Sequence, residues 1–460
     1  MPTRVLVPSG VLGLGFDRAA LARGVAARPD IIAIDGGSTD SGPFSLGEGV
    51  SKYSRAATKS EWRQLMKARA EAGVPLVLGT AGTCGCDATV DWMVAITREL
   101  AKELGQTVKV AKLYSSQPRE AIATALRDGR ITPLEAAPEV SPAVVLEMTN
   151  IVALAGAEQV QAALATGADI VICGRTTDTA TIAALPLARG DHAGGAWHGA
   201  KIAECGALCS TNPTSGVIMV DFDETGFTVE PLAASARCTP HSVSAHMLYE
   251  NTDPFVLYEP GGRLDVRGAA YRALDERRVR VEGSQWIPGP YTVKLEGARI
   301  AGYQTTILAI LRNGHYVAHA REWVAKLSTY LEGEIASRME LKPGDYHLDF
   351  RLIGLDSALG ALENRQGMPA EVGVLGIVTA ETQESAAEIG KLINPFVLHY
   401  PLTEDEELPT FSFPYSPATT DRGALYEFAL NHILALDEAA GGPMAAFRLE
   451  LEEIGHVELV

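Results

Sequence analysis

The stretch Gly167-Ala168-Asp169-Ile170-Val171-Ile172-Cys173-Gly174-Arg175-Thr176-Thr177-Asp178 decides the fold class of this 460-residue chain. Gly167 stands where a helix would end, and residues 169–172 form a short, mostly apolar run that predicts a buried strand. A polar loop rich in Gly and Thr follows this strand. A buried strand that is entered from a helix and left through such a loop is typical of a parallel sheet with helices on both faces.

The same alternation of strand and helix patterns runs through the first 200 residues. Apolar, β-branched runs predict strands at 4–7, 30–34, 74–78, 107–113 and 151–154. Segments with helical composition separate them, at 17–27, 61–72, 89–104, 119–128 and 158–165. The predicted fold class is therefore α/β, with an N-terminal parallel, Rossmann-like sheet domain over residues 1–215.

After about residue 215 the pattern predicts an α+β domain with a mixed sheet, over residues 216–393. A hairpin is expected at 217–230, further strands at 278–282, 291–295, 346–353 and 372–378, and helices at 316–335 and 381–393. Residues 394–460 are predicted to form a C-terminal segment. It contains a proline-rich stretch, a helix near 424–436 and a strand near 446–451.

Composition and charge narrow the function classes. Lys and Arg number 39 against 57 Asp and Glu, so the net charge is −18, which disfavours binding to nucleic acid or an anionic membrane. We find no apolar run of the roughly 18 residues that a membrane-spanning helix needs. The six cysteines follow no extracellular disulfide spacing, which predicts a reduced, cytoplasmic protein. A homo-oligomer is expected as for most soluble enzymes.

The loops that leave the predicted strands point to a binding site. Ligands bind beyond the carboxyl ends of strands in open parallel sheets, and Gly-rich loops beside helix N-termini suit a carboxylate or phosphate. Each loop taken alone could be no more than a turn with helix caps. Together they predict a pocket whose substrate-binding residues are Gly36, Gly37, Ser38, Thr39, Asp40, Thr80, Gly82, Thr83, Arg175, Thr176, Thr177 and Lys294.

Acid and base candidates lie among the same loops. Asp178 and Glu204 are predicted to transfer protons, with Asp35 as a third catalytic carboxyl group. Arg175, three residues before Asp178, is predicted to hold the substrate anion, together with the backbone N–H groups of the glycine loops. Reactive thiols are a weaker alternative, and the candidates are Cys84, Cys86, Cys205 and Cys209.

Cofactor signals are weak. Gly10, Gly13 and Gly15 do not follow the G-x-G-x-x-G order of dinucleotide-binding proteins, and we find no P-loop motif. Asp35 lies at the end of the second strand, where an acidic residue can bind a ribose, so a nicotinamide cofactor remains an alternative. No zinc spacing of Cys and His occurs, but Mg²⁺ or another divalent cation could bind Asp35, Asp178 or Glu204.

Four stretches of this sequence resemble the acyclic terpene utilisation A (AtuA-like) family. Residues 167–178 look like its GADIVITGR signature, and Glu204-Cys205-Gly206 looks like the ECG that follows it. Residues 246–254 and 290–294 are similar to two later motifs. The chain departs from the family pattern in the loop 36–40 and at 209–212, so its pocket should differ and the terpenoid substrate is in doubt.

The resemblance implies a catabolic lyase of a hydroxylated, carboxylated acyl-CoA. It also implies a small companion subunit, to which the segment 394–460 has a faint likeness. The predicted function is a lyase or hydro-lyase acting on a small hydroxy acid or its CoA thioester. Two other classes stay open: a nucleotide-dependent oxidoreductase, and a non-catalytic subunit of a two-component enzyme.

Overall fold

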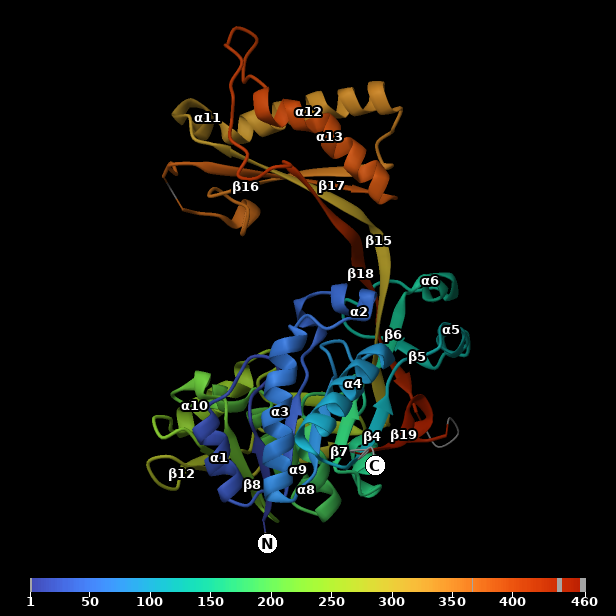
Figure 1. Cartoon of the computed structure of the whole chain (residues 1–460), viewed down its shortest axis with the longest axis vertical. Helices are drawn as coiled ribbons and strands as arrows, with labels where there is room; N and C mark the ends of the chain where they lie inside the picture. The colour runs from blue at the N-terminus through green and yellow to red at the C-terminus, as the bar shows by residue number, and fades with distance from the viewer. Residues whose placement is uncertain (1, 366, 437–440, 456–460) are drawn as a thin grey trace. The chain divides into compact units, whose positions relative to one another are not determined.

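The computed structural model describes residues 2–365, 367–436 and 441–455, and it divides the chain into two compact units (Figure 1). The first unit comprises the described residues of Met1–Arg299 and Phe428–Val460, and the second comprises Ile300–Glu427. The second unit is thus one continuous segment of chain that interrupts the first. All the strands that carry the predicted site loops belong to the first unit.

A ten-stranded sheet forms the centre of the first unit. Its middle strands run parallel, in the order β1 (Thr3–Val7), β2 (Ile31–Asp35), β3 (Leu76–Gly79), β7 (Ile170–Cys173) and β4 (Val108–Tyr114). Antiparallel strands extend the sheet beyond β1, in the order β8 (Ile218–Phe222), β9 (Gly226–Pro231), β13 (Val279–Glu282) and β12 (Ala270–Ala273). The other edge is β19 (Arg448–Ile454), antiparallel to β4. The predicted fold class is confirmed.

Helices cover both faces of this sheet, as the apolar strands require. In β2 the side chains of Ile32 and Ile34 pack into one core with α1 (Arg18–Ala26), α3 (Arg55–Ala72) and α4 (Asp87–Leu104). Ile31 and Ala33 point the other way, into a core with α7 (Ala157–Ala165), α8 (Ala180–Arg189) and α9 (Ala193–Ala203). Because successive strand residues face opposite sides, a strand buried on both faces reads as a continuous apolar run.

Smaller elements complete the first unit. A three-stranded antiparallel sheet contains β10 (Val256–Glu259), β11 (Gly262–Asp265) and β14 (Gln285–Pro288). The predicted strand at 151–154 is β6 (Asn150–Ala153), but it pairs antiparallel with β15 (Thr292–Leu311) and lies outside the parallel sheet. The remaining elements are α2 (Phe44–Glu48), α5 (Arg119–Arg127), β5 (Ile131–Pro133), α6 (Pro142–Glu147), α10 (Pro240–Ala245) and the 3₁₀ turns Thr39–Ser41, Gly206–Cys209, Pro213–Ser215, His246–Leu248 and Pro443–Ala446.

The second unit is an antiparallel sheet covered by helices. The last residues of β15 pair with β17 (Val372–Ala380), which pairs in turn with β16 (Tyr346–Ile353). Trp323, Leu327, Leu331 and Ile335, spaced four residues apart on α12 (Ala320–Met339), are fully buried in its core. The other elements are α11 (Gly314–Ala318), the 3₁₀ turn Gly360–Leu362, α13 (Gln383–His399) and the start of β18 (Thr419–Ala435).

Two features differ from the sequence-based expectations. The compact units do not follow the expected boundaries at 215 and 393, because β8, β9, β13 and β12 extend the sheet of the first unit. The Ala and Leu content of residues 424–436 predicts a helix, and this is wrong, since residues up to Ala435 belong to β18. Its residues 432–434 pair with β5, and this long-range pairing overrides local helix propensity.

Two further points concern particular segments of the chain. Of the expected C-terminal segment, residues 437–440 and 456–460 lie outside the described residues. Among the helices of the described ranges, none is long and apolar enough to cross a membrane.

Candidate functional site

A cavity of about 790 Å³ opens at the carboxyl end of the parallel sheet. Its wall comes from the loops after β1 and β2, the loop before α8 and the end of α9. A second cavity of about 440 Å³ shares four of its residues. The shared residues are Asp40, Asp178, Glu204 and Glu250. The loops after β2 and β7 therefore do converge.

Asp35 is the last residue of β2 and lies in the wall of the larger cavity. Its side chain is 5% exposed, and one carboxylate oxygen accepts the N–H of Gly37 at 2.8 Å. The other oxygen has no hydrogen-bond partner among the described residues. Burial, and then the nearby charge of Asp178, raises the pKa of Asp35 well above its usual range. Burial therefore favours the protonated form of this carboxyl group.

Asp178 and Glu204 face both cavities. Burial raises the pKa of Asp178, although the charge of Arg175 opposes this. Glu204 caps the end of α9 and pairs with Lys201, one turn earlier in the same helix. Burial raises the pKa of Glu204 to about 8 despite this ion pair. Raised pKa values of two carboxyl groups in one pocket mark them as candidates for proton transfer.

Arg175 is held in a buried ion-pair cluster beside these carboxyl groups. Its Nε donates to Glu296 Oε2 at 3.1 Å, and Nη1 donates to Thr80 Oγ1 at 3.2 Å and to the carbonyl of Thr176 at 3.3 Å. Lys294 Nζ lies 3.0 Å from Glu296 Oε1, and Thr39 Oγ1 donates to Oε2 at 2.9 Å. Burial opposes ionisation of Glu296, but Arg175 and Lys294 lower its pKa to about 2.

The predicted substrate-binding residues separate into three groups. Ser38 and Asp40 line the larger cavity, and Arg175, Thr176 and Thr177 line the smaller one. Thr39, Thr80 and Lys294 support the Arg175–Glu296 pair, as described above. The third group, Gly36, Gly37, Gly82 and Thr83, contributes to neither cavity lining.

The backbone of the third group is already engaged. The N–H of Gly37 donates to Asp35, and that of Thr83 donates to the carbonyl of Gly36 at 3.0 Å. These groups therefore position Asp35 and the loop after β3. Thr80 and Thr83 adopt φ of 36° and 78°, which is strained for β-branched residues. Such strain is commonly found at functional sites.

Of the candidate cysteines, Cys205 alone lines the larger cavity. Cys84 and Cys86 are buried, with their sulfur atoms 3.6 Å apart, in a small apolar cluster. Cys209 is also buried. Burial, and then the charge of Glu204, raises the pKa of the Cys205 thiol. This favours the protonated thiol and disfavours a free thiolate nucleophile.

Several residues of the site were not anticipated. Glu296 follows Lys294 by two residues on one strand, so the two side chains share a face, and that spacing was a usable signal. Glu250 lies within the quoted 246–254 stretch, but its sequence context gave no chemical reason to select it. Lys201 and Glu259 line the smaller cavity and are brought there by tertiary packing.

Close approach of backbone segments explains why the Glu204-Cys205-Gly206 turn ends in glycine. Gly206 adopts φ of +59°, and a Cβ added there would lie 2.4 Å from the carbonyl oxygen of Gly216. We expect Gly206→Ala to destabilise the protein by about 2–5 kcal/mol, measured by chemical unfolding.

Gly167→Ala is the matched control for this substitution. Gly167 has φ of +70°, and a Cβ added there would meet open space, so this variant should lose only about 1 kcal/mol from backbone strain. Equal losses in the two variants would contradict the role of close packing at Gly206.

The fold and the cavity define an α/β protein with a carboxyl-rich pocket at the carboxyl edge of a parallel sheet. The family model described as acyclic terpene utilisation family protein AtuA matches residues 49–409, and the chain belongs to this family. No curated protein and no solved structure matches the chain. The resemblance of the sequence motifs to this family is confirmed.

Proposed function

We propose that the chain is a metabolic lyase or hydro-lyase that acts on a small hydroxy acid or its CoA thioester in the larger cavity. The observation that carries the proposal is the group of three carboxyl side chains, Asp35, Asp178 and Glu204, whose pKa values are all raised in one pocket. Elimination or carbon–carbon cleavage of a hydroxy acid needs one proton acceptor and one proton donor.

Raised pKa values also help an acidic pocket to accept an anion, because they favour the neutral form of each carboxyl group. Carboxyl groups that stay protonated carry no charge, and they donate hydrogen bonds to a substrate oxygen. Lys52 lines the same cavity, with Nζ 3.2 Å from Ser41 Oγ. A substrate carboxylate bound by Lys52 would lie in the same cavity as the three carboxyl groups.

Asp178 is the group best suited to proton transfer on substrate. It lines both cavities and lies 3.7 Å from Arg175 Nη1, so a cation stabilises its charge when the proton leaves. Asp35, at the end of β2, is the second group assigned to proton transfer. Arg175 keeps its Glu296 partner and acts by fixing the loop that carries Asp178.

A thermal-shift screen tests this proposal. Small hydroxy di- and tricarboxylates and acyl-CoA thioesters, each with and without Mg²⁺, are added to the full chain. A ligand at 100 times its Kd should stabilise the protein by about 2.7 kcal/mol, visible as a Tm rise of several degrees. Each hit is then incubated with enzyme, and products are identified by mass spectrometry.

The same screen includes NAD, NADP and the corresponding uncharged alcohols as controls. Stabilisation by a nicotinamide cofactor with no response to any acid would overturn the proposal. Unchanged hits after prolonged incubation would do so as well.

A further inference from the structure

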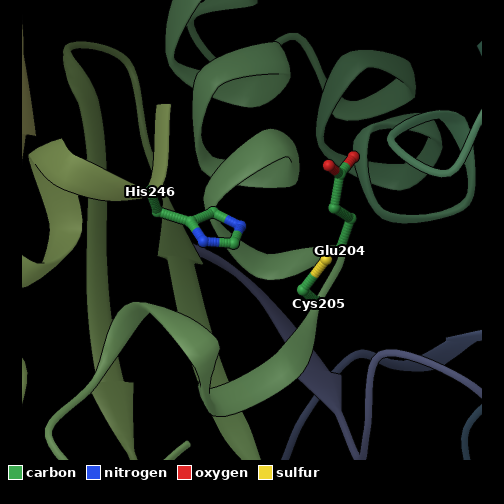
Figure 2. Close-up of side chains that lie close together, drawn as sticks. All are labelled: Glu204, Cys205 and His246. Carbon is green, nitrogen blue, oxygen red and sulfur yellow. The ribbon is translucent and has the colours of Figure 1, made fainter. Parts of the chain in front are cut away.

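Three side chains with different ligand atoms meet beside the larger cavity, which two of them, Glu204 and Cys205, line. Glu204, Cys205 and His246 each offer one ligand atom, and these atoms all lie within 4.8 Å of one another. Figure 2 shows the imidazole ring of His246 turned toward the other two side chains, across the end of a helix. Ligand atoms this close need only small side-chain movements to surround a single cation with bonds of about 2.0–2.3 Å.

His246 gives an independent sign that a ligand is expected here. The residue is 4% exposed, and its Nε2 atom has no hydrogen-bond partner among the described residues. A buried polar atom without a partner costs free energy, so such atoms in folded proteins call for an explanation. The ring stacks on Tyr249 with centroids 5.6 Å apart, which holds its orientation. A metal ion bonded to Nε2 would satisfy this atom.

The local chain places these ligands firmly. Glu204 and Cys205 lie at the end of α9, just before the Gly206 turn, and Gly10 packs against the backbone of Cys205. A Cβ at Gly10 would come within 2.9 Å of Cys205 Cα. His246 follows α10 and begins a 3₁₀ turn. Ligands at the ends of packed elements are restricted in position, as a metal site requires.

From these observations we infer that Glu204, Cys205 and His246 bind a divalent cation of the zinc class. A set of one thiolate, one imidazole and one carboxylate suits Zn²⁺, whereas Mg²⁺ prefers oxygen ligands throughout. Glu204 and Cys205 line the cavity, so a fourth coordination position would open to it. Three protein ligands with one open position are the arrangement of catalytic zinc sites.

The inference deepens the proposed function, and its consequence for catalysis rests on that function. On binding, the thiol of Cys205 gives up its proton to solvent and becomes a thiolate ligand. Glu204 is then a ligand that also pairs with Lys201, and Asp178 and Asp35 keep the proton transfers. The cation would supply a Lewis acid for a substrate oxygen.

Metal binding is measured on the full chain without any substrate. The protein is stripped with a chelator, dialysed, and titrated with Co²⁺ or Zn²⁺, and bound metal is quantified by elemental analysis. We expect one equivalent of metal and, for Co²⁺, the near-ultraviolet charge-transfer band that a thiolate ligand produces. Cys205→Ser should lose this band, and His246→Ala should weaken binding by about 10-fold or more.

His241→Asn is the matched control, because His241 is an exposed histidine on α10, five residues before His246. It should bind Co²⁺ with the affinity and spectrum of the unmodified chain. The inference is overturned if the unmodified chain shows no thiolate band with Co²⁺. This measurement does not depend on the folding of any variant. It is also overturned if His246→Ala binds as tightly as His241→Asn, or if Mg²⁺ alone binds. Because no turnover is measured, these outcomes are independent of the substrate screen.

Discussion

Replacing Asp178 by Asn lowers kcat by about 10²–10⁴ for the acid that the substrate screen identifies. Asn keeps the size of the side chain but cannot exchange a proton, and loss of a general acid or base has an effect of this order. Because Asn can still hydrogen-bond, ligand-induced stabilisation should stay close to that of the unmodified chain. Steady-state kinetics and the thermal shift, measured on the same preparation, separate chemistry from binding.

Asp128→Asn is the control for this experiment, since Asp128 is exposed at the end of α5 and contributes to neither cavity. It should keep the kcat of the unmodified chain. A turnover number for Asp178→Asn within about twofold of this control would remove Asp178 from the mechanism. Parallel loss of kcat and of ligand binding would instead assign it a role in binding.

The second large effect concerns stability. Arg175→Met should lower the free energy of unfolding by about 3–5 kcal/mol, because Glu296 would remain buried with its main counter-charge removed. Glu296 is 4% exposed, and Lys294, its other cationic partner, has a side chain that is 39% exposed. Chemical unfolding monitored by tryptophan fluorescence gives the difference.

Two variants make this measurement specific. Arg278→Met removes an exposed ion pair with Asp275 in the same unit, at 2.7 Å, and should cost less than about 1 kcal/mol. The double variant Arg175→Met with Glu296→Leu should recover most of the loss, because no buried charge is left alone. A loss for Arg175→Met as small as that for Arg278→Met would show that the buried cluster does not stabilise the fold.

The parallel half of the fold could be predicted because its evidence is local. A short, continuous apolar run, such as residues 31–34, indicates a strand that is buried on both faces of a parallel sheet. In such a sheet the loops that follow the strands lie at the same edge. This reasoning brings Asp35 and Asp178 to one sheet edge, because they lie at the end of β2 and in the loop after β7, whereas Glu204 lies at the end of α9 and reaches the same cavity through helix packing. The antiparallel extension was out of reach, because pairing of Val220 with Val5 is a long-range fact that neither segment encodes alone.

The partner of Arg175 could not be predicted from the sequence either. The sequence places an arginine next to Asp178, which suggests an anchor for a substrate anion. Its partner Glu296 lies 121 residues away, and β15 brings it to the same loop. Likewise, His246 reaches Cys205 through packing of α10. The sequence can therefore indicate which residues lie at the sheet edge, but it does not indicate which charged residues pair with one another there.

The edge strand β19 has a consequence for how the protein is made. Tyr114 of β4 pairs with Arg448, which lies 334 positions further along the chain, so a long stretch of polypeptide must leave the ribosome before β4 gains its outer neighbour. Until then the nascent chain carries an unpaired strand edge, which is a known template for aggregation. The segment Ile300–Glu427, being continuous, can complete its own core earlier in synthesis. Emergence of β19 thus covers the unpaired side of β4, and truncation before this strand should increase the demand for chaperones.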